Sequence, residues 1–158
     1  MKILFSESQK FTQWWLWLIL TGVAGIPVYG IYEQLFLGEV FGTRPISDEG
    51  LIFLAVFVAG LWALFLVMRL QTEIDRGEIR LKFVPFLKKI IPWAEVVSAE
   101  VKDYGFIGGW GIRISTKYGR AYNVKGSKGL VLTLKNGKKV LVGTQKEAEL
   151  GAVVKTCI

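Results

Sequence analysis

Two long uncharged apolar runs in the first seventy residues constrain this chain more than any other feature. The first run extends from Phe11 to Tyr32 and the second from Gly50 to Met68, and neither contains an Asp, Glu, Lys or Arg. A helix that crosses a bilayer needs roughly 20 predominantly apolar residues. The runs therefore predict two membrane-spanning helices, at about residues 11–36 and 48–69.

Two other interpretations of the apolar runs fit less well. Buried core helices would need a large protein around them, and residues 70–158 are enough for only one small domain. A cleavable signal peptide would need a small-residue cleavage site after the first run, and none follows Tyr32. The sequence therefore predicts a transmembrane helical hairpin in residues 1–69 and a separate domain in residues 70–158.

The charges beside the apolar runs predict the orientation of the hairpin. The connection between the runs contains Glu33, Glu39, Asp48 and Glu49 against the single base Arg44. Lys and Arg concentrate on the cytoplasmic side of membrane helices. Both termini are therefore expected in the cytoplasm, with the acidic loop outside, in a multi-pass protein of the inner cell membrane. The basic flanks that support this orientation are Lys2, Lys10, Arg69, Arg76, Arg80, Lys82, Lys88 and Lys89.

The pattern changes to short strands after Met68. Glu78–Val84 alternates apolar and charged side chains, which is typical of a half-buried strand. Asn136-Gly137 between two apolar runs is a strong hairpin signal. Thr144 and Glu147 match a capping box, which predicts a C-terminal helix at about residues 145–156. Other expected strands are Leu70–Ile74, Lys88–Ile91, Val96–Lys102, Gly111–Thr116, Arg120–Val124, Gly129–Leu134 and Lys138–Val142.

These elements predict an α+β membrane protein. A two-helix transmembrane hairpin would be followed by a small antiparallel β-barrel or sandwich, which the C-terminal helix caps. The order of elements resembles the bacterial pleckstrin-homology-like (PH-like) domains, which often follow two transmembrane helices. The strings that carry the resemblance are Thr72–Ile79, Ile91-Pro92-Trp93, Gly108–Arg113 and Val142–Lys146. The resemblance implies a fold and an architecture, but it does not imply a known activity.

Several kinds of chemistry lack the residues they need. The chain has no His, and its single Cys is Cys157, so His-based catalysis, His metal sites and an intrachain disulfide are all excluded. The glycines between Gly105 and Gly111 precede an expected strand, whereas a dinucleotide loop precedes a helix. They are better explained as a wide turn that lets Trp110 fold back over the sheet. We therefore expect no catalytic residues, no metal site, no cofactor and no enzymatic activity.

Positive charge beside aromatic residues marks the candidate binding surface. From residue 69 onward there are 17 Lys and Arg against 8 Asp and Glu. Such surfaces can bind nucleic acid, but a transmembrane anchor favours anionic lipid, where each basic residue near the surface contributes about 1 kcal/mol. No nucleic-acid partner is therefore expected. The candidate lipid-binding or partner-binding residues are Tyr104, Trp110, Arg113, Arg120, Tyr122, Lys125 and Lys128.

Three functions remain open on the sequence alone. The leading hypothesis is a non-enzymatic, membrane-anchored PH-like module that binds a protein partner, another copy of itself or anionic lipid headgroups. A second is an accessory or regulatory subunit of a larger membrane complex. A third is an enzyme of unassigned chemistry.

Overall fold

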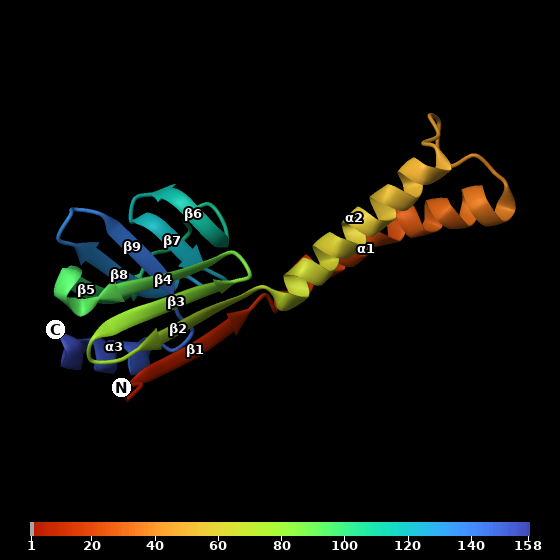
Figure 1. Cartoon of the computed structure of the whole chain (residues 1–158). Helices are drawn as coiled ribbons and strands as arrows, with labels where there is room; N and C mark the ends of the chain where they lie inside the picture. The colour runs from red at the N-terminus through yellow and green to blue at the C-terminus, as the bar shows by residue number, and fades with distance from the viewer. Residues whose placement is uncertain (1) are drawn as a thin grey trace. The chain divides into compact units, whose positions relative to one another are not determined.

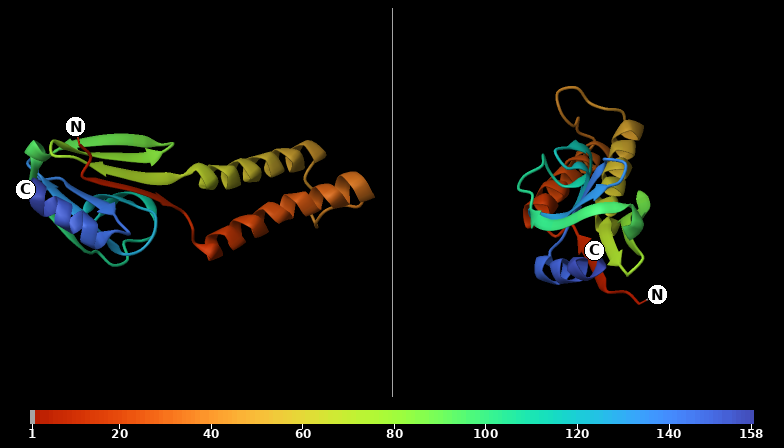
Figure 2. Two further views of the ribbon diagram at one scale, coloured as in Figure 1. Left: turned by 90° about the horizontal axis from the view of Figure 1, so that it is seen from below. Right: turned by 90° about the vertical axis from the view of Figure 1, so that its left-hand side faces the viewer.

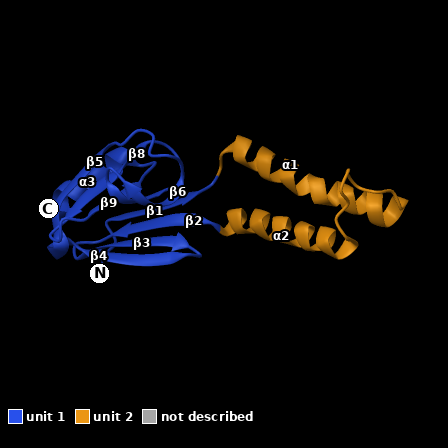
Figure 3. Ribbon diagram, turned by 90° about the horizontal axis from the view of Figure 1, so that it is seen from above, with its two compact units in different colours: residues 1–11, 68–158 blue, residues 12–67 orange. Residues whose placement is uncertain are grey.

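A computed structural model describes residues 2–158 and separates the chain into two compact units (Figure 3). The helical unit comprises residues 12–67. The β unit combines the N-terminal segment through Phe11 with residues 68–158. This division differs from the boundary expected at residue 69, because the first eleven residues belong with the β unit and not with the helices.

The helical unit contains two long apolar helices (Figure 1). Helix α1 (Trp14–Ile31) continues into a π-helical segment, η1 (Tyr32–Leu37), and α2 extends over Asp48–Val67. Both helices are long and apolar enough to cross a membrane. Ser47 caps α2, because its Oγ accepts the backbone N–H of Gly50 at 3.2 Å.

Aromatic rings provide a contact between α1 and α2. The rings of Trp17 and Trp62 meet edge to face with their centroids 5.4 Å apart. Close glycine packing does not contribute at Gly22, Gly25 or Gly60, because a Cβ added at any of them would have no neighbour within 4 Å.

The β unit contains two sheets and a C-terminal helix (Figures 1 and 2). One sheet has the strand order β1-β2-β3-β4 and the other has the order β5-β8-β9-β7-β6. All eight strands expected from the sequence are present, each within one residue of its predicted bounds. The elements are β1 (Phe5–Lys10), β2 (Arg69–Ile74), β3 (Glu78–Val84), β4 (Leu87–Pro92), the 3-10 turn η2 (Trp93–Glu95), β5 (Val96–Asp103), β6 (Gly111–Thr116), β7 (Gly119–Asn123), β8 (Lys128–Leu134), β9 (Lys139–Gly143) and α3 (Glu147–Cys157).

Two features of the sheets bear on the expected antiparallel barrel or sandwich. Within residues 2–158 the strands form two separate sheets with no closure into a barrel, an arrangement compatible with a sandwich. Strands β7 and β9 pair in parallel, with Arg120 opposite Val140. Strand β9 lies between β8 and β7. It pairs antiparallel with β8 after the tight turn at Asn136-Gly137, and its other side pairs in parallel with β7. The sequence predicted that turn correctly, but it did not predict the order of the strands.

Strand β1 is absent from the elements expected from the sequence. It pairs antiparallel with β2 over its whole length, from Phe5 opposite Ile74 to Lys10 opposite Arg69. Its inward side chains alternate as a strand requires, but two of them, Glu7 and Gln9, are polar. Hydrophobic periodicity therefore gave no signal for this strand.

Glu7 and Gln9 form hydrogen bonds with the segment that leads from the last residue of β9 toward α3. The Thr144 hydroxyl donates to Glu7 Oε2 at 2.6 Å, and the Gln145 backbone N–H donates to Glu7 Oε1 at 2.7 Å. Gln9 Nε2 donates to the Gly143 carbonyl oxygen at 2.7 Å. These bonds satisfy buried polar groups, so they tie the N-terminal strand to the start of the last helix.

The predicted capping box at Thr144 is wrong because Glu7 binds the Thr144 side chain. The Thr144 hydroxyl binds Glu7 and accepts the Lys146 N–H at 3.0 Å, whereas Glu147 forms an ion pair with Lys128. Helix α3 accordingly begins at Glu147, two residues later than expected.

The pairing of β1 with β2 predicts how the β unit can be isolated. Replacing residues 12–67 by an Asn-Gly dipeptide joins two adjacent antiparallel strand ends through a two-residue turn. We expect a soluble protein with cooperative thermal unfolding, measured by circular dichroism. A fragment of residues 70–158 lacks Phe5, Glu7 and Gln9 and should unfold at a much lower temperature or aggregate. Equal stability of the two proteins would show that β1 is dispensable.

Candidate anion-binding site

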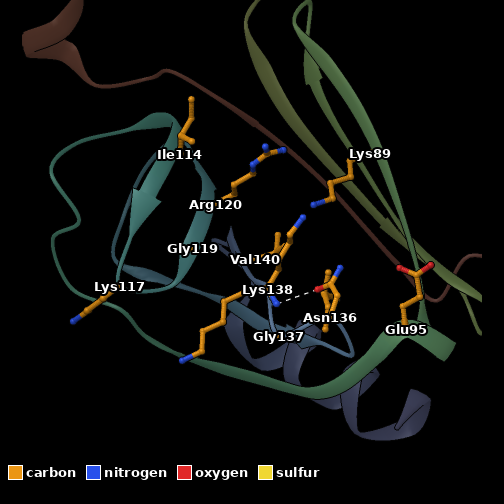
Figure 4. A pocket seen from close by; sticks show the side chains of 12 residues that line it. Lys89, Glu95, Ile114, Lys117, Gly119, Arg120, Asn136, Gly137, Lys138 and Val140 are labelled. Carbon is orange, nitrogen blue, oxygen red and sulfur yellow. Dashed lines mark hydrogen bonds between the residues drawn. The ribbon is translucent and has the colours of Figure 1, made fainter.

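A cavity of about 640 Å³ opens in the β unit between β4 and the strands of the second sheet (Figure 4). Strand β4 forms one wall, and β6, β7 and the turn between β8 and β9 form the other. Its lining is strongly basic, with five cations against one carboxylate, Glu95. The cations are Lys89, Lys117, Arg120, Lys138 and Lys139.

Three of the cations converge. Figure 4 shows the side chains of Lys89, Arg120 and Lys138 directed toward the same space, whereas Lys117 points away from it. Each of the three comes from a different part of the chain: β4, β7 and the turn before β9. The convergence is therefore a property of the tertiary fold and not of a local run of charge.

The strand registers explain why Lys89 and Arg120 reach the cavity. Lys89 lies opposite Leu81 in β3, and Leu81 is fully buried, so Lys89 extends from the inner face of the first sheet. Arg120 lies opposite the buried Val140 in β9. Side chains in one cross-strand row share a face of the sheet. Both cations therefore continue apolar core rows, Lys89 in the edge strand β4 and Arg120 in β7, which lies next to the edge strand β6.

The turns beside the cavity hold Lys138 and Arg120 in place. Asn136 Oδ1 accepts the backbone N–H of Lys138 at 3.0 Å, and Gly137 takes the positive φ of 76° that the turn requires. Gly119, just before Arg120, has a φ of 69° and lies so close to Lys139 that a Cβ would collide with the Lys139 carbonyl. Only glycine fits that position.

The three converging cations have no carboxylate partner. Within residues 2–158, Lys89, Arg120 and Lys138 form no ion pair, whereas Arg80 on the outer face of the same sheet bridges Glu73, Asp75 and Glu78. Partial burial, together with the nearby charges of Arg120 and Lys138, lowers the pKa of Lys89, and Glu95 opposes this shift. An anion in the cavity would relieve the repulsion among the three cations.

The residues proposed from the sequence are placed in several different environments. Arg120 lines the cavity. Tyr104 and Tyr122 are buried in the core, and the Tyr104 hydroxyl donates to the Gly126 carbonyl oxygen at 3.1 Å. Lys125 and Lys128 lie near the turn between β7 and β8, where Lys128 forms an ion pair with Glu147.

Trp110 and Arg113 lie at the glycine-rich segment before β6 and in β6 itself. The Arg113 guanidinium packs so closely on Gly109 that a Cβ there would collide with it. The Trp110 side chain is 37% exposed, so it covers the sheet only in part. Neither residue lines the basic cavity. Beside them, Phe106 and Ile114 are 80% and 74% exposed.

The sequence-based set of candidates lacked Lys89 and Lys138. Lys89 belongs to the run Lys88-Lys89-Ile90-Ile91, in which two cations precede two apolar residues, so alternation does not reveal which lysine faces inward. The inward position follows only from the pairing of Lys89 with Leu81. Lys138 follows the predicted Asn136-Gly137 turn, but its approach to Lys89 depends on how the two sheets pack.

Comparison with models of known protein families gives no match, and no curated protein matches the sequence. The geometry and charge of the cavity are therefore the main indication of what the protein binds.

Among residues 2–158, Lys89 has nearby cations and no ion pair, so its charge is expected to lower the stability of the protein. Lys89→Met should raise the thermal midpoint of the full-length protein in detergent, because it removes repulsion worth roughly 0.5 kcal/mol, equivalent to about 2–4 °C in a domain of this size. The folded-state pKa is lowered, so the destabilisation is present while Lys89 is charged. The advantage of the variant should shrink as pH rises through that pKa.

The matched control is Lys135→Met, which removes a charge from the exposed turn between β8 and β9 outside the cavity. We expect its midpoint to stay close to that of the wild type in circular dichroism melts. A Lys89→Met protein that melts at or below the wild-type temperature would contradict the repulsion argument.

Proposed function

We propose that this protein is a non-enzymatic, membrane-anchored binding module that holds a phosphate-bearing anion in the basic cavity of its β unit. The observation that carries the proposal is the convergence of Lys89, Arg120 and Lys138 without a carboxylate partner. Keeping three unpaired cations together is unfavourable for folding, and functional sites commonly retain such groups. Arg120 adds a planar fork of donors that matches phosphate oxygens.

The proposed anchor is the pair of apolar helices. Their length and composition support two membrane crossings. The acidic connection between them and the basic residues outside them support an inner-membrane protein with both termini in the cytoplasm. The cavity would then face the anionic cytoplasmic leaflet or the soluble anions of the cytoplasm.

The proposed fold family is the PH-like domains. Two apolar helices, two sheets and a C-terminal helix occur in the order that this resemblance implies. The position of β1 before the helices is a feature that the resemblance did not include. Membership would account for the architecture, but the ligand still has to be inferred from the cavity.

A second candidate function is docking of a protein partner at strand β6. This strand lies at the edge of its sheet, and its register with β7 is irregular between Arg113 and Thr116. Ile114 in the strand and Phe106 before it are 74% and 80% exposed. An open edge with apolar side chains suits strand addition, as in an accessory subunit of a membrane complex.

The orientation predicts the behaviour of reporter fusions. A reporter that is active only outside the cytoplasm should stay silent when fused after Ile158 and become active when inserted between Gly38 and Gly42. Both positions test the same positive-inside argument. Activity at the C-terminus would reverse the topology and place the basic cavity on the outer side.

The cavity predicts saturable binding of phosphate anions. The full-length protein in nanodiscs of neutral lipid should bind inorganic pyrophosphate in isothermal titration calorimetry. Arg120→Ala or Lys138→Ala should weaken binding about tenfold or more, since a hydrogen bond to a charged group is worth about 1.5–3 kcal/mol and 1.4 kcal/mol is tenfold. Binding should also weaken as pH rises through the lowered pKa of Lys89.

The control variant is Lys125→Ala, which removes a charge outside the cavity and should leave pyrophosphate binding unchanged. The same titration in nanodiscs that contain phosphatidylglycerol tests whether a lipid headgroup supplies the phosphate. A lower affinity for pyrophosphate than in neutral nanodiscs indicates that the phosphatidylglycerol headgroup competes for the cavity. Unchanged affinity indicates a soluble anion or a headgroup that carries a further phosphate. Absence of pyrophosphate binding in neutral nanodiscs would refute the proposal and favour docking at β6.

A further inference from the structure

The first sheet has a clear polarity of charge along its strands. At the end where β1 stops and β2 starts, Lys10, Arg69 and Val84 form the last cross-strand row. The next two rows contain no Asp or Glu and add Lys82 opposite Lys88. The opposite end carries Glu73, Asp75 and Glu78 together with two cations, Arg76 in the turn between β2 and β3 and Arg80, which pairs with all three carboxylates. One end of the sheet is therefore cationic and the other is rich in carboxylates.

The turn between β3 and β4 lies at the cationic end and presents an apolar tip. The Phe86 backbone N–H donates to the Phe83 carbonyl oxygen at 2.7 Å, which closes a tight turn beyond Val84. The Phe86 side chain is 56% exposed, and its ring lies 6.5 Å from that of the buried Phe83. The tip is therefore an apolar side chain on a short, internally bonded turn and not on a long flexible loop.

The chain connection at Met68 joins this end of the sheet directly to the end of α2. Only Met68 separates α2 from β2, so the Cα atoms of Val67 and Arg69 lie within about 7 Å of each other. Arg69 is directly opposite Val84, at the roughly 5 Å spacing of antiparallel neighbours. The turn that carries Phe86 therefore starts one strand away from the point where the chain leaves the second apolar helix.

We propose that the β3–β4 turn is a third point of membrane contact, with Phe86 in the bilayer interface and Lys10, Arg69 and Lys88 among anionic headgroups. The inference rests on the proposed membrane anchoring. A single exposed apolar residue is ordinary on a soluble domain. Here the apolar tip is framed by cations and starts one strand away from the connection to α2, and such surfaces suit an anionic bilayer. The contact would restrict how the β unit tilts on its two short connections.

Depth measurements with spin labels test this contact in the full-length protein. With Cys157→Ser as the background, Phe86→Cys and Lys88→Cys are each labelled with a nitroxide in bilayers that contain phosphatidylglycerol. We expect the Phe86 label to be accessible to oxygen and protected from a water-soluble nickel complex, and the Lys88 label to be intermediate. The matched control is Arg76→Cys, in the turn at the opposite end of the sheet, whose label should be fully exposed to the nickel complex.

A label at Phe57→Cys in α2 separates failure of this inference from failure of the anchor. Phe57 is 61% exposed in the middle of the apolar helix, so its label should report bilayer depth if α2 spans the membrane. A deep Phe57 label with Phe86 and Lys88 labels as exposed as the Arg76 label would overturn the membrane-contact proposal alone. A water-exposed Phe57 label would overturn the anchoring, and the membrane contact with it.

Discussion

The pairing of β1 with β2 is the interaction on which the rest of the protein depends. It makes the two chain ends of the helical unit leave the β unit side by side, at Lys10 and Arg69. It also carries Glu7 to the start of α3, where one carboxylate binds both the Thr144 hydroxyl and the Gln145 N–H. The apolar helices are therefore an insertion into a β-hairpin, and residues far apart in sequence close the same domain.

The sequence predicted the elements that have a regular pattern. The two apolar helices and eight strands followed from hydrophobicity, and Asn136-Gly137 followed from turn chemistry. Strand β1 could not be predicted in this way, because Glu7 and Gln9 occupy its buried face and are stabilised by partners more than 130 residues away. The parallel pairing of β7 with β9 likewise depends on strand order, which local patterns do not determine.

The candidate site was only partly predictable for a related reason. Composition identified a basic domain, and Arg120 was among the residues singled out, but Tyr104 and Tyr122 proved to be core residues. Basic residues close in sequence, such as Lys125 and Lys128, were natural candidates, yet Lys128 is neutralised by Glu147. The cations that converge come from separate strands, and their lack of carboxylate partners is visible only once both sheets are placed. Cations without carboxylate partners therefore locate the candidate site better than the density of charge along the chain does.

The distance between Lys89 in the cavity and Phe86 in the β3–β4 turn limits which ligand can reach the cavity. Lys89, in β4, follows Phe86 by three residues, a rise of about 10 Å. If Phe86 lies in the bilayer interface and β4 runs away from the membrane, the phosphodiester next to the lipid glycerol lies near Lys88 and Arg69, and Lys89 lies further from the bilayer. A phosphate that reaches Lys89, Arg120 and Lys138 must then be carried further from the membrane. The geometry accordingly favours a headgroup with an additional distal phosphate, or a soluble phosphate-bearing molecule, over a simple diester headgroup.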